Sequence, residues 1–106
     1  MKAVFRPRFI LDIEEAADYL QTEAGEPVVV QWRDALKQTL AALREFPELG
    51  RIRADLPIEG IRTFYVKGFA NWLVFYRVEK GTVEFLRVKH GMMHLPGLFE
   101  SKPPSA

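Results

Sequence analysis

The sequence predicts an α+β domain in which an N-terminal strand and a helix hairpin pack on a mainly antiparallel sheet of about four strands. Three observations support this prediction. Apolar residues recur every three or four positions over two long segments of the first half, as in amphipathic helices. Three short segments of the second half are rich in β-branched and aromatic residues, as in strands. Short turns separate these segments, so neighbouring strands run antiparallel.

The first half is predicted to contain one strand and two helices. Residues 2–6 alternate weakly between apolar and polar and form the strand, which Pro7 ends. A helix follows over residues 8–23, and a glycine after it supplies a stop signal. A second helix is predicted over residues 27–46. Pro47 ends it, because the residue before a proline avoids helical geometry.

The second half is predicted to form a three-stranded meander. Residues 47–60 contain two prolines and two glycines, which favours a connector without regular structure. The predicted strands then span 61–66, 72–78 and 82–89. A short hairpin turn joins the last two strands, and residues 67–71 join the first two. Residues 90–99 are predicted to form a short apolar segment with a helical turn.

The composition is typical of one globular domain. The chain has 106 residues, of which 48% are hydrophobic and 27% charged, and it contains no cysteine. Disulfides, a thiolate nucleophile and a cysteine-based zinc site are therefore excluded. No apolar stretch approaches the roughly 20 residues of a membrane span, and the N-terminus lacks the apolar region of a signal peptide. We expect a cytoplasmic protein with one domain at residues 1–100 and a flexible tail at 101–106.

Charge is distributed unevenly along the chain, although the net charge is only +1. Residues 1–50 contain 9 acidic and 6 basic residues, whereas residues 51–106 contain 5 acidic and 9 basic residues. The notable basic side chains of the second half are Arg51, Arg53, Arg62, Arg77, Arg87, Lys89 and His90. Aromatic residues alternate with them at Phe64, Tyr65, Trp72, Phe75 and Tyr76. Strand alternation predicts that Phe85, Arg87 and Lys89 share one face of the sheet.

Two interpretations of this basic set follow from its chemistry. Guanidinium groups match phosphates and aromatic rings stack on bases, so a sheet face of this kind can hold nucleic acid or an acidic peptide. Alternatively, the arginines pair with carboxylates of the acidic helices. His90 stands at a strand end, where a histidine serves as a general acid or base or as a structural hydrogen-bonding residue. His90 and His94 have helical metal-ligand spacing but lack a third ligand, so no metal or cofactor is expected.

Five short motifs, in the right order and on the right elements, resemble the ParE branch of the RelE/ParE toxin superfamily, the toxin half of type II toxin–antitoxin modules. The first-helix match comprises Pro7, Asp12, Ile13, Glu14, Asp18 and Tyr19. The other matches are Pro47-x-x-Gly50-Arg51-x-Arg53, Gly60-Ile61-Arg62, Tyr76-Arg77 and Arg87-Val88-x-His90-Gly91. The resemblance covers about residues 3–99.

The resemblance implies a cytoplasmic toxin that a cognate antitoxin, ParD-like or other, wraps and silences with a partly acidic segment. Studied ParE members inhibit DNA gyrase and are not nucleases. The expected contacts with the target or with phosphate are Arg51, Arg53, Arg62, Arg77 and Arg87. The expected antitoxin contacts are Tyr19, Trp32, Arg62, Tyr65, Arg77 and Arg87. For Trp32 the alternative is a place in the core beneath the sheet, and direct binding of nucleic acid by the toxin stays open.

Two alternatives to gyrase inhibition remain. RelE-like relatives cleave messenger RNA in the ribosomal A site, and in this chain His90, Arg87 and Arg62 are the candidates for that reaction. No tyrosine follows Tyr76, however, so the C-terminal tyrosine of many such nucleases is missing. The second alternative is a protein with the toxin fold that has lost its toxicity and remains as a regulator bound to the antitoxin.

Overall fold

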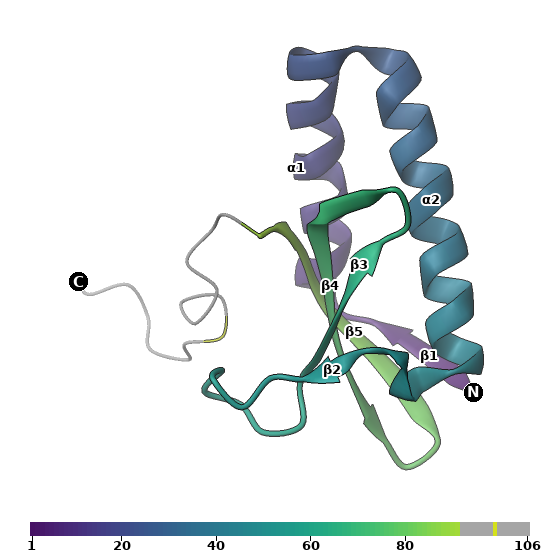
Figure 1. Cartoon of the computed structure of the whole chain (residues 1–106), viewed down its shortest axis with the longest axis vertical. Coiled ribbons are helices and arrows are strands. Elements are labelled where there is room, and N and C mark those ends of the chain that lie inside the picture. Colours follow the sequence, from purple (N-terminus) through teal and green to yellow (C-terminus); the bar gives the residue numbers. More distant parts are fainter. Residues whose placement is uncertain (92–98, 100–106) are drawn as a thin grey trace.

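The computed structural model describes residues 1–91 and Phe99. The predicted helical turn within residues 90–99, the His94 ligand candidate and the tail at 101–106 therefore lie largely outside the described residues. The elements in chain order are β1 (Lys2–Phe5), α1 (Pro7–Ala24), α2 (Glu26–Glu45), the 3-10 turn η1 (Pro47–Leu49), β2 (Arg51–Ile52), β3 (Arg62–Val66), β4 (Phe69–Glu79) and β5 (Thr82–His90). Figure 1 shows their arrangement.

The five strands form one sheet in the order β1-β5-β4-β3-β2. β2 to β5 are antiparallel neighbours, whereas β1 pairs with β5 in parallel. A parallel pair needs a long crossover, and the two helices supply part of it (Figure 1). The predicted α+β class and mainly antiparallel sheet are confirmed, with five strands in place of about four.

The helix hairpin turns at a single residue, Gly25, whose φ is 91°. That backbone conformation is costly for any residue with a Cβ atom. The N–H group of Gly25 donates to the carbonyls of Leu20 and Gln21, which closes the end of α1. α2 begins at the next residue, with Pro27 in its first turn. The two predicted helices are confirmed to within two residues at each end.

Two strand assignments differ from the prediction. β2 lies inside the predicted connector, where Arg51 and Ile52 pair with β3. Two residues are too few to show the alternation of a strand, and the prolines and glycines around them favour a connector without regular structure. β4 begins at Phe69 rather than at Trp72. The turn between β3 and β4 has only two residues, because Phe69 already pairs with Val66 at the end of β3. Gly68, with a φ of 82°, allows the chain to reverse there.

A β-bulge in β5 overturns the predicted alternation of this strand. Phe75 of β4 pairs with Arg87 of β5, and Tyr76 pairs with Phe85. Leu86 is therefore the extra residue of β5. Phe85 consequently packs in the core beneath the helices, as does Val88. Leu86 packs against the cluster on the opposite face, and Arg87 faces Phe75 of that cluster. The prediction that Phe85 and Arg87 share a face is therefore wrong.

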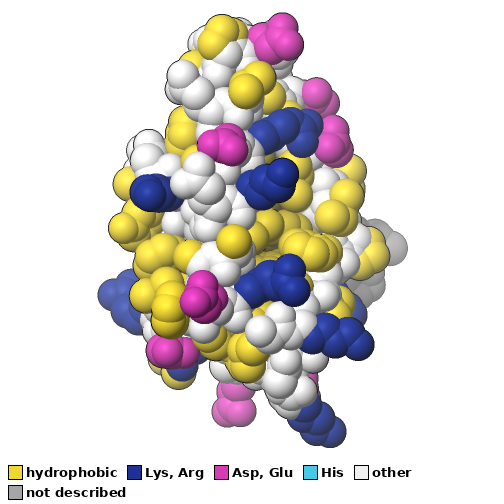
Figure 2. Space-filling model, turned by 90° about the vertical axis from the view of Figure 1, so that its right-hand side faces the viewer, with side chains coloured by type: hydrophobic (Ala, Val, Ile, Leu, Met, Phe, Trp, Pro, Cys, Tyr) yellow, Lys and Arg dark blue, Asp and Glu magenta, His cyan; other side chains and the backbone are white. Residues whose placement is uncertain are grey.

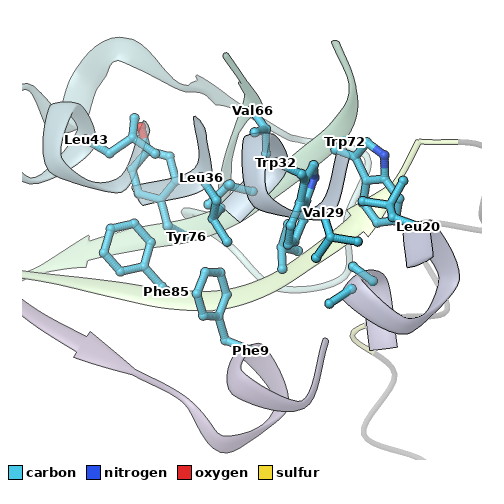
Figure 3. Packing of buried hydrophobic residues seen from close by; sticks show 14 of the residues in the cluster. Phe9, Leu20, Val29, Trp32, Leu36, Leu43, Val66, Trp72, Tyr76 and Phe85 are labelled. Atoms are coloured by element: carbon cyan, nitrogen blue, oxygen red, sulfur yellow. The ribbon is translucent and has the colours of Figure 1, made fainter. Parts of the chain in front are cut away.

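The main core lies between the helix hairpin and one face of the sheet. Trp32 of α2 is fully buried at its centre, with Trp72 and Leu20 toward one end and Tyr76 and Phe85 toward the other (Figure 3). Each large apolar side chain buried in this way contributes about 1.5–3 kcal/mol. A smaller cluster of Leu56, Ile61 and Phe75 covers the other face.

Candidate functional site

A buried carboxylate joins α1 to β5. The side chain of Asp12, only 1% exposed, accepts hydrogen bonds from Nε and Nη2 of Arg87 at 2.7 and 3.1 Å. It also accepts the backbone N–H of Val88 at 3.1 Å, and Lys89 Nζ lies 3.3 Å from its Oδ1. We call these four residues the Asp12 cluster. Two cations and one N–H group compensate the desolvation of a single buried charge.

The Asp12 cluster forms where β1 stops. β1 pairs with β5 only as far as Phe85, because Pro7 starts α1 immediately afterwards. Beyond that point α1 lies beside β5, and the Asp12 carboxylate accepts the Val88 N–H that a longer β1 would have accepted. Arg87 and Lys89 reach the same carboxylate from neighbouring positions of β5. The charges of this cluster thus hold the helix hairpin against the sheet.

A pocket of about 310 Å³ opens next to the Asp12 cluster, between α1 and the adjoining ends of β4 and β5. We call it the α1–β5 pocket; its lining is Asp12, Glu15, Ala16, Tyr19, Trp72, Val88, Lys89 and His90. Trp72 is nearly buried and contacts the core through Trp32, with ring centroids 5.4 Å apart. On its other sides lie the rings of Tyr19 at 6.3 Å and His90 at 5.4 Å. The pocket therefore has aromatic walls and a charged rim.

Lys89 and Glu15 supply the charges at the mouth of the α1–β5 pocket, where Nζ and Oε1 are 3.3 Å apart. Tyr19 is 55% exposed, so its ring is available to a partner molecule. This arrangement suits an apolar or aromatic side chain in the pocket and a charged neighbour at the rim.

The motif Pro47-x-x-Gly50 is held by two side chains of the sheet. The hydroxyl of Tyr76 donates to the Pro47 carbonyl at 2.5 Å and accepts the Gly50 N–H at 2.8 Å. Burial raises the pKa of this hydroxyl above its usual value, and the Gly50 N–H acts in the opposite direction. Nη1 of Arg62 donates to the Gly50 carbonyl at 2.6 Å. Tyr76 and Arg62 therefore fix the chain where it leaves α2.

The other candidate arginines are mostly engaged within the chain. Arg53 forms two hydrogen bonds with Asp55, at 2.8 and 2.7 Å, and these hold the pKa of that exposed carboxyl below its usual value. Arg77 lies 2.6 Å from Glu84, which also pairs with Arg6 at 3.4 Å. Arg51 is exposed on β2.

The structure does not bring the three nuclease candidates together. Arg62 is opposite Tyr76 on β4, whereas His90 is opposite Trp72, four residues away along the same strand. That separation is about 13 Å at the rise of a β-strand. Arg62 donates to the Gly50 carbonyl, and Arg87 is 9% exposed within the Asp12 cluster.

The three aromatic residues among the predicted antitoxin contacts differ in exposure. Tyr19 and Tyr65 are exposed, at 55% and 47%. Trp32 is a core residue with no exposed surface, because α2 turns it toward the sheet. Sequence reasoning assigned no site role to Asp12 or Glu15; it named Asp12 only as part of the first-helix motif. Their spacing relative to Tyr19 was the available signal, because positions three, four and seven apart share one side of a helix.

Two further features were sought in the part of the chain that the structure describes. No three histidine or acidic side chains there gather in the geometry of a metal site. Among the same residues, no helix has the length and hydrophobicity that crossing a lipid bilayer requires.

The chain is similar to a solved structure described as "Chromosomal ParDE TA system from P. aeruginosa", with a TM-score of 0.71 and 16% sequence identity over 85% of this chain and 95% of that chain. The family described as "ParE toxin of type II toxin-antitoxin system, parDE" matches residues 3–95. This chain therefore belongs to the ParE toxin family and is the toxin component of a type II system. A search of curated protein sequences finds no match.

Proposed function

We propose that the chain is a non-enzymatic toxin of the cytoplasm that inhibits DNA gyrase and is neutralised by a cognate antitoxin. The observation that supports this proposal most strongly is the match to the ParE toxin family over residues 3–95. The geometry agrees with inhibition by binding rather than by RNA cleavage. Arg62 and Arg87 donate to groups of the chain itself, and His90 lies far from Arg62 along the sheet.

The test of this function compares the two candidate targets with one preparation of protein. We expect purified toxin to inhibit gyrase supercoiling and to leave messenger RNA intact in a translation assay. Addition of the antitoxin should restore supercoiling. Cleaved messenger RNA with normal supercoiling would instead establish the RelE-like alternative. If the purified protein affects neither gyrase supercoiling nor messenger RNA, and cells that express it alone grow normally, the protein keeps the fold without the toxicity.

Two surfaces are suited to an antitoxin segment that is partly apolar and partly acidic. The first is the α1–β5 pocket with the exposed ring of Tyr19. The second lies on the helix hairpin, where Ile13, Leu36 and Leu40 line a groove of about 190 Å³ with two basic side chains beside them. Viewed from the side of α2, hydrophobic side chains form a band across the molecule, with Lys and Arg side chains along it (Figure 2). Basic groups beside apolar surface attract an acidic, partly apolar chain.

Replacing Tyr19 with alanine is expected to weaken antitoxin binding by about 10- to 100-fold, in the range of a moderate hot-spot residue. The ring is more than half exposed, so its removal should leave the fold intact. Isothermal titration calorimetry with the antitoxin measures the effect. Tyr65→Ala tests the exposed aromatic position on β3 in the same way. Val30→Ala is the control, because Val30 is 59% exposed on α2 and outside both surfaces. Equal affinity of Tyr19→Ala and Val30→Ala would place the antitoxin elsewhere.

A further inference from the structure

Three large apolar residues are exposed where the chain passes from α2 to β2. Phe46 follows α2, Leu49 ends η1 and Ile52 ends β2. These residues are 51%, 48% and 56% exposed, and each stands three positions from the next. Glu48 and Arg51 lie between them in the sequence. We call these five residues the η1 patch.

The backbone that carries the η1 patch is fixed from the interior of the protein. The buried hydroxyl of Tyr76 bonds to the Pro47 carbonyl and to the Gly50 N–H. Arg62 donates to the Gly50 carbonyl from the neighbouring strand. The segment around Leu49 is therefore ordered before any partner arrives, which lowers the entropic cost of binding. Apolar side chains that are exposed on such a fixed support are suited to contact with another protein surface.

The two charged residues of the η1 patch have opposite signs. Both are exposed, and the ion pairs within residues 1–91 include neither Glu48 nor Arg51. An acidic partner would meet Glu48 as a like charge, and a basic partner would meet Arg51 in the same way. Two identical patches that meet about a two-fold axis avoid this conflict, because each charge can face its opposite on the other copy. The η1 patch is thus complementary to itself.

We propose that the η1 patch binds the same patch of a second copy of this chain. Phe46, Leu49 and Ile52 of the two copies shield one another from water, and Glu48 of each copy faces Arg51 of the other. β2 is the last strand of the sheet but has only two residues, so side chains rather than an extended strand ladder supply the contact. Three apolar residues from each copy make a small interface, and the dimer should dissociate on dilution. This proposal does not depend on the cellular target.

Sedimentation equilibrium of the full chain tests the proposal. We expect a monomer–dimer equilibrium that shifts toward the dimer as the protein concentration rises. Leu49→Asp places a charge among the apolar side chains of the contact and should weaken dimerisation at least about 10-fold. Val30→Asp is the matched control, because Val30 is 59% exposed near the opposite end of α2. It should leave the equilibrium unchanged.

Charge reversal tests whether the partner is a second copy. Glu48→Arg leaves only basic charges in the η1 patch, and Arg51→Glu leaves only acidic ones. Either variant alone should dimerise about 10-fold more weakly at low ionic strength, because two contacts become repulsive. A mixture of the two variants restores both opposite-charge contacts and should form a heterodimer. Lys2→Glu makes the same charge change as Arg51→Glu at the opposite edge of the sheet and should have no effect.

Three outcomes would overturn the proposal. The first is a monomer at every concentration. The second is a dimer that Leu49→Asp and Val30→Asp affect equally, which would place the contact on another surface. The third is a mixture of Glu48→Arg and Arg51→Glu that stays monomeric, because a two-fold contact requires the two variants to complement each other. Thermal melting establishes that each variant is folded, and the exposed charge variants provide the test even if Leu49→Asp does not fold.

Discussion

Replacing Arg87 with alanine is expected to lower the free energy of unfolding by about 3–5 kcal/mol, the cost of leaving one partner of a buried ion pair alone. Asp12 would keep Lys89 at 3.3 Å and the Val88 N–H but would lose two hydrogen bonds from the guanidinium. Asp12 is only 1% exposed, so its carboxylate would lose these partners in a desolvated position. Urea denaturation followed by circular dichroism measures the change as a lower midpoint with an unchanged slope.

Arg77→Ala is the matched control for Arg87→Ala. Arg77 also forms a short ion pair, 2.6 Å from Glu84, but its side chain is 35% exposed. Solvent screens such a pair, so we expect a loss of no more than about 1 kcal/mol. Similar losses for the two variants would show that burial of the Asp12 cluster does not determine its strength. The same loss of stability affects toxicity assays. An inactive Arg87→Ala variant indicates a role of Arg87 in toxicity only if the variant is shown to be folded.

The sequence predicted the two helices and the longer strands well because each of these elements has local signals. Period 3.6 marks both helices, and Pro7 and Pro47 mark where segments end. The pairing of Asp12 with Arg87 has no local signal, since 75 positions separate the two residues. Both belong to motifs that resemble the ParE branch, and both hold the fold together. The motifs therefore included two residues that stabilise the fold, but they did not indicate this structural role.

The candidate site was harder to predict than the fold for two physical reasons. A bulge at Leu86 changes which side chains of β5 face the helices, and a single sequence gives no sign of it. Side-chain type also does not reveal exposure. Trp32 and Trp72 are alike in the sequence, yet one lies at the core centre and the other lines the α1–β5 pocket. Only the packing of helix on sheet separates the two tryptophans.

Replacing Gly50 with alanine is expected to destabilise the protein by about 2–4 kcal/mol, from overpacking and a weakened hydrogen bond together. A Cβ atom at this position would overlap the Tyr76 hydroxyl and lie 2.7 and 2.8 Å from two carbons of its ring. Tyr76 is fully buried and cannot swing aside. Thermal and urea denaturation measure the loss. Gly68→Ala is a useful comparison, because no atom lies within 4 Å of that Cβ position and its cost arises from backbone strain at φ of 82°.

Tyr76→Phe is expected to cost about 1–3 kcal/mol by leaving the Pro47 carbonyl and the Gly50 N–H without their hydroxyl partner. The double variant with Gly50→Ala tests whether the two residues act as one unit. Phenylalanine removes the overlapping hydroxyl but keeps the two close ring carbons, so it relieves only part of the crowding. The combined loss should therefore fall short of the sum of the single losses by about 0.5–1 kcal/mol, as for residues in contact. Strictly additive losses would mean that the turn at Pro47 relaxes away from Tyr76 when Gly50 is replaced.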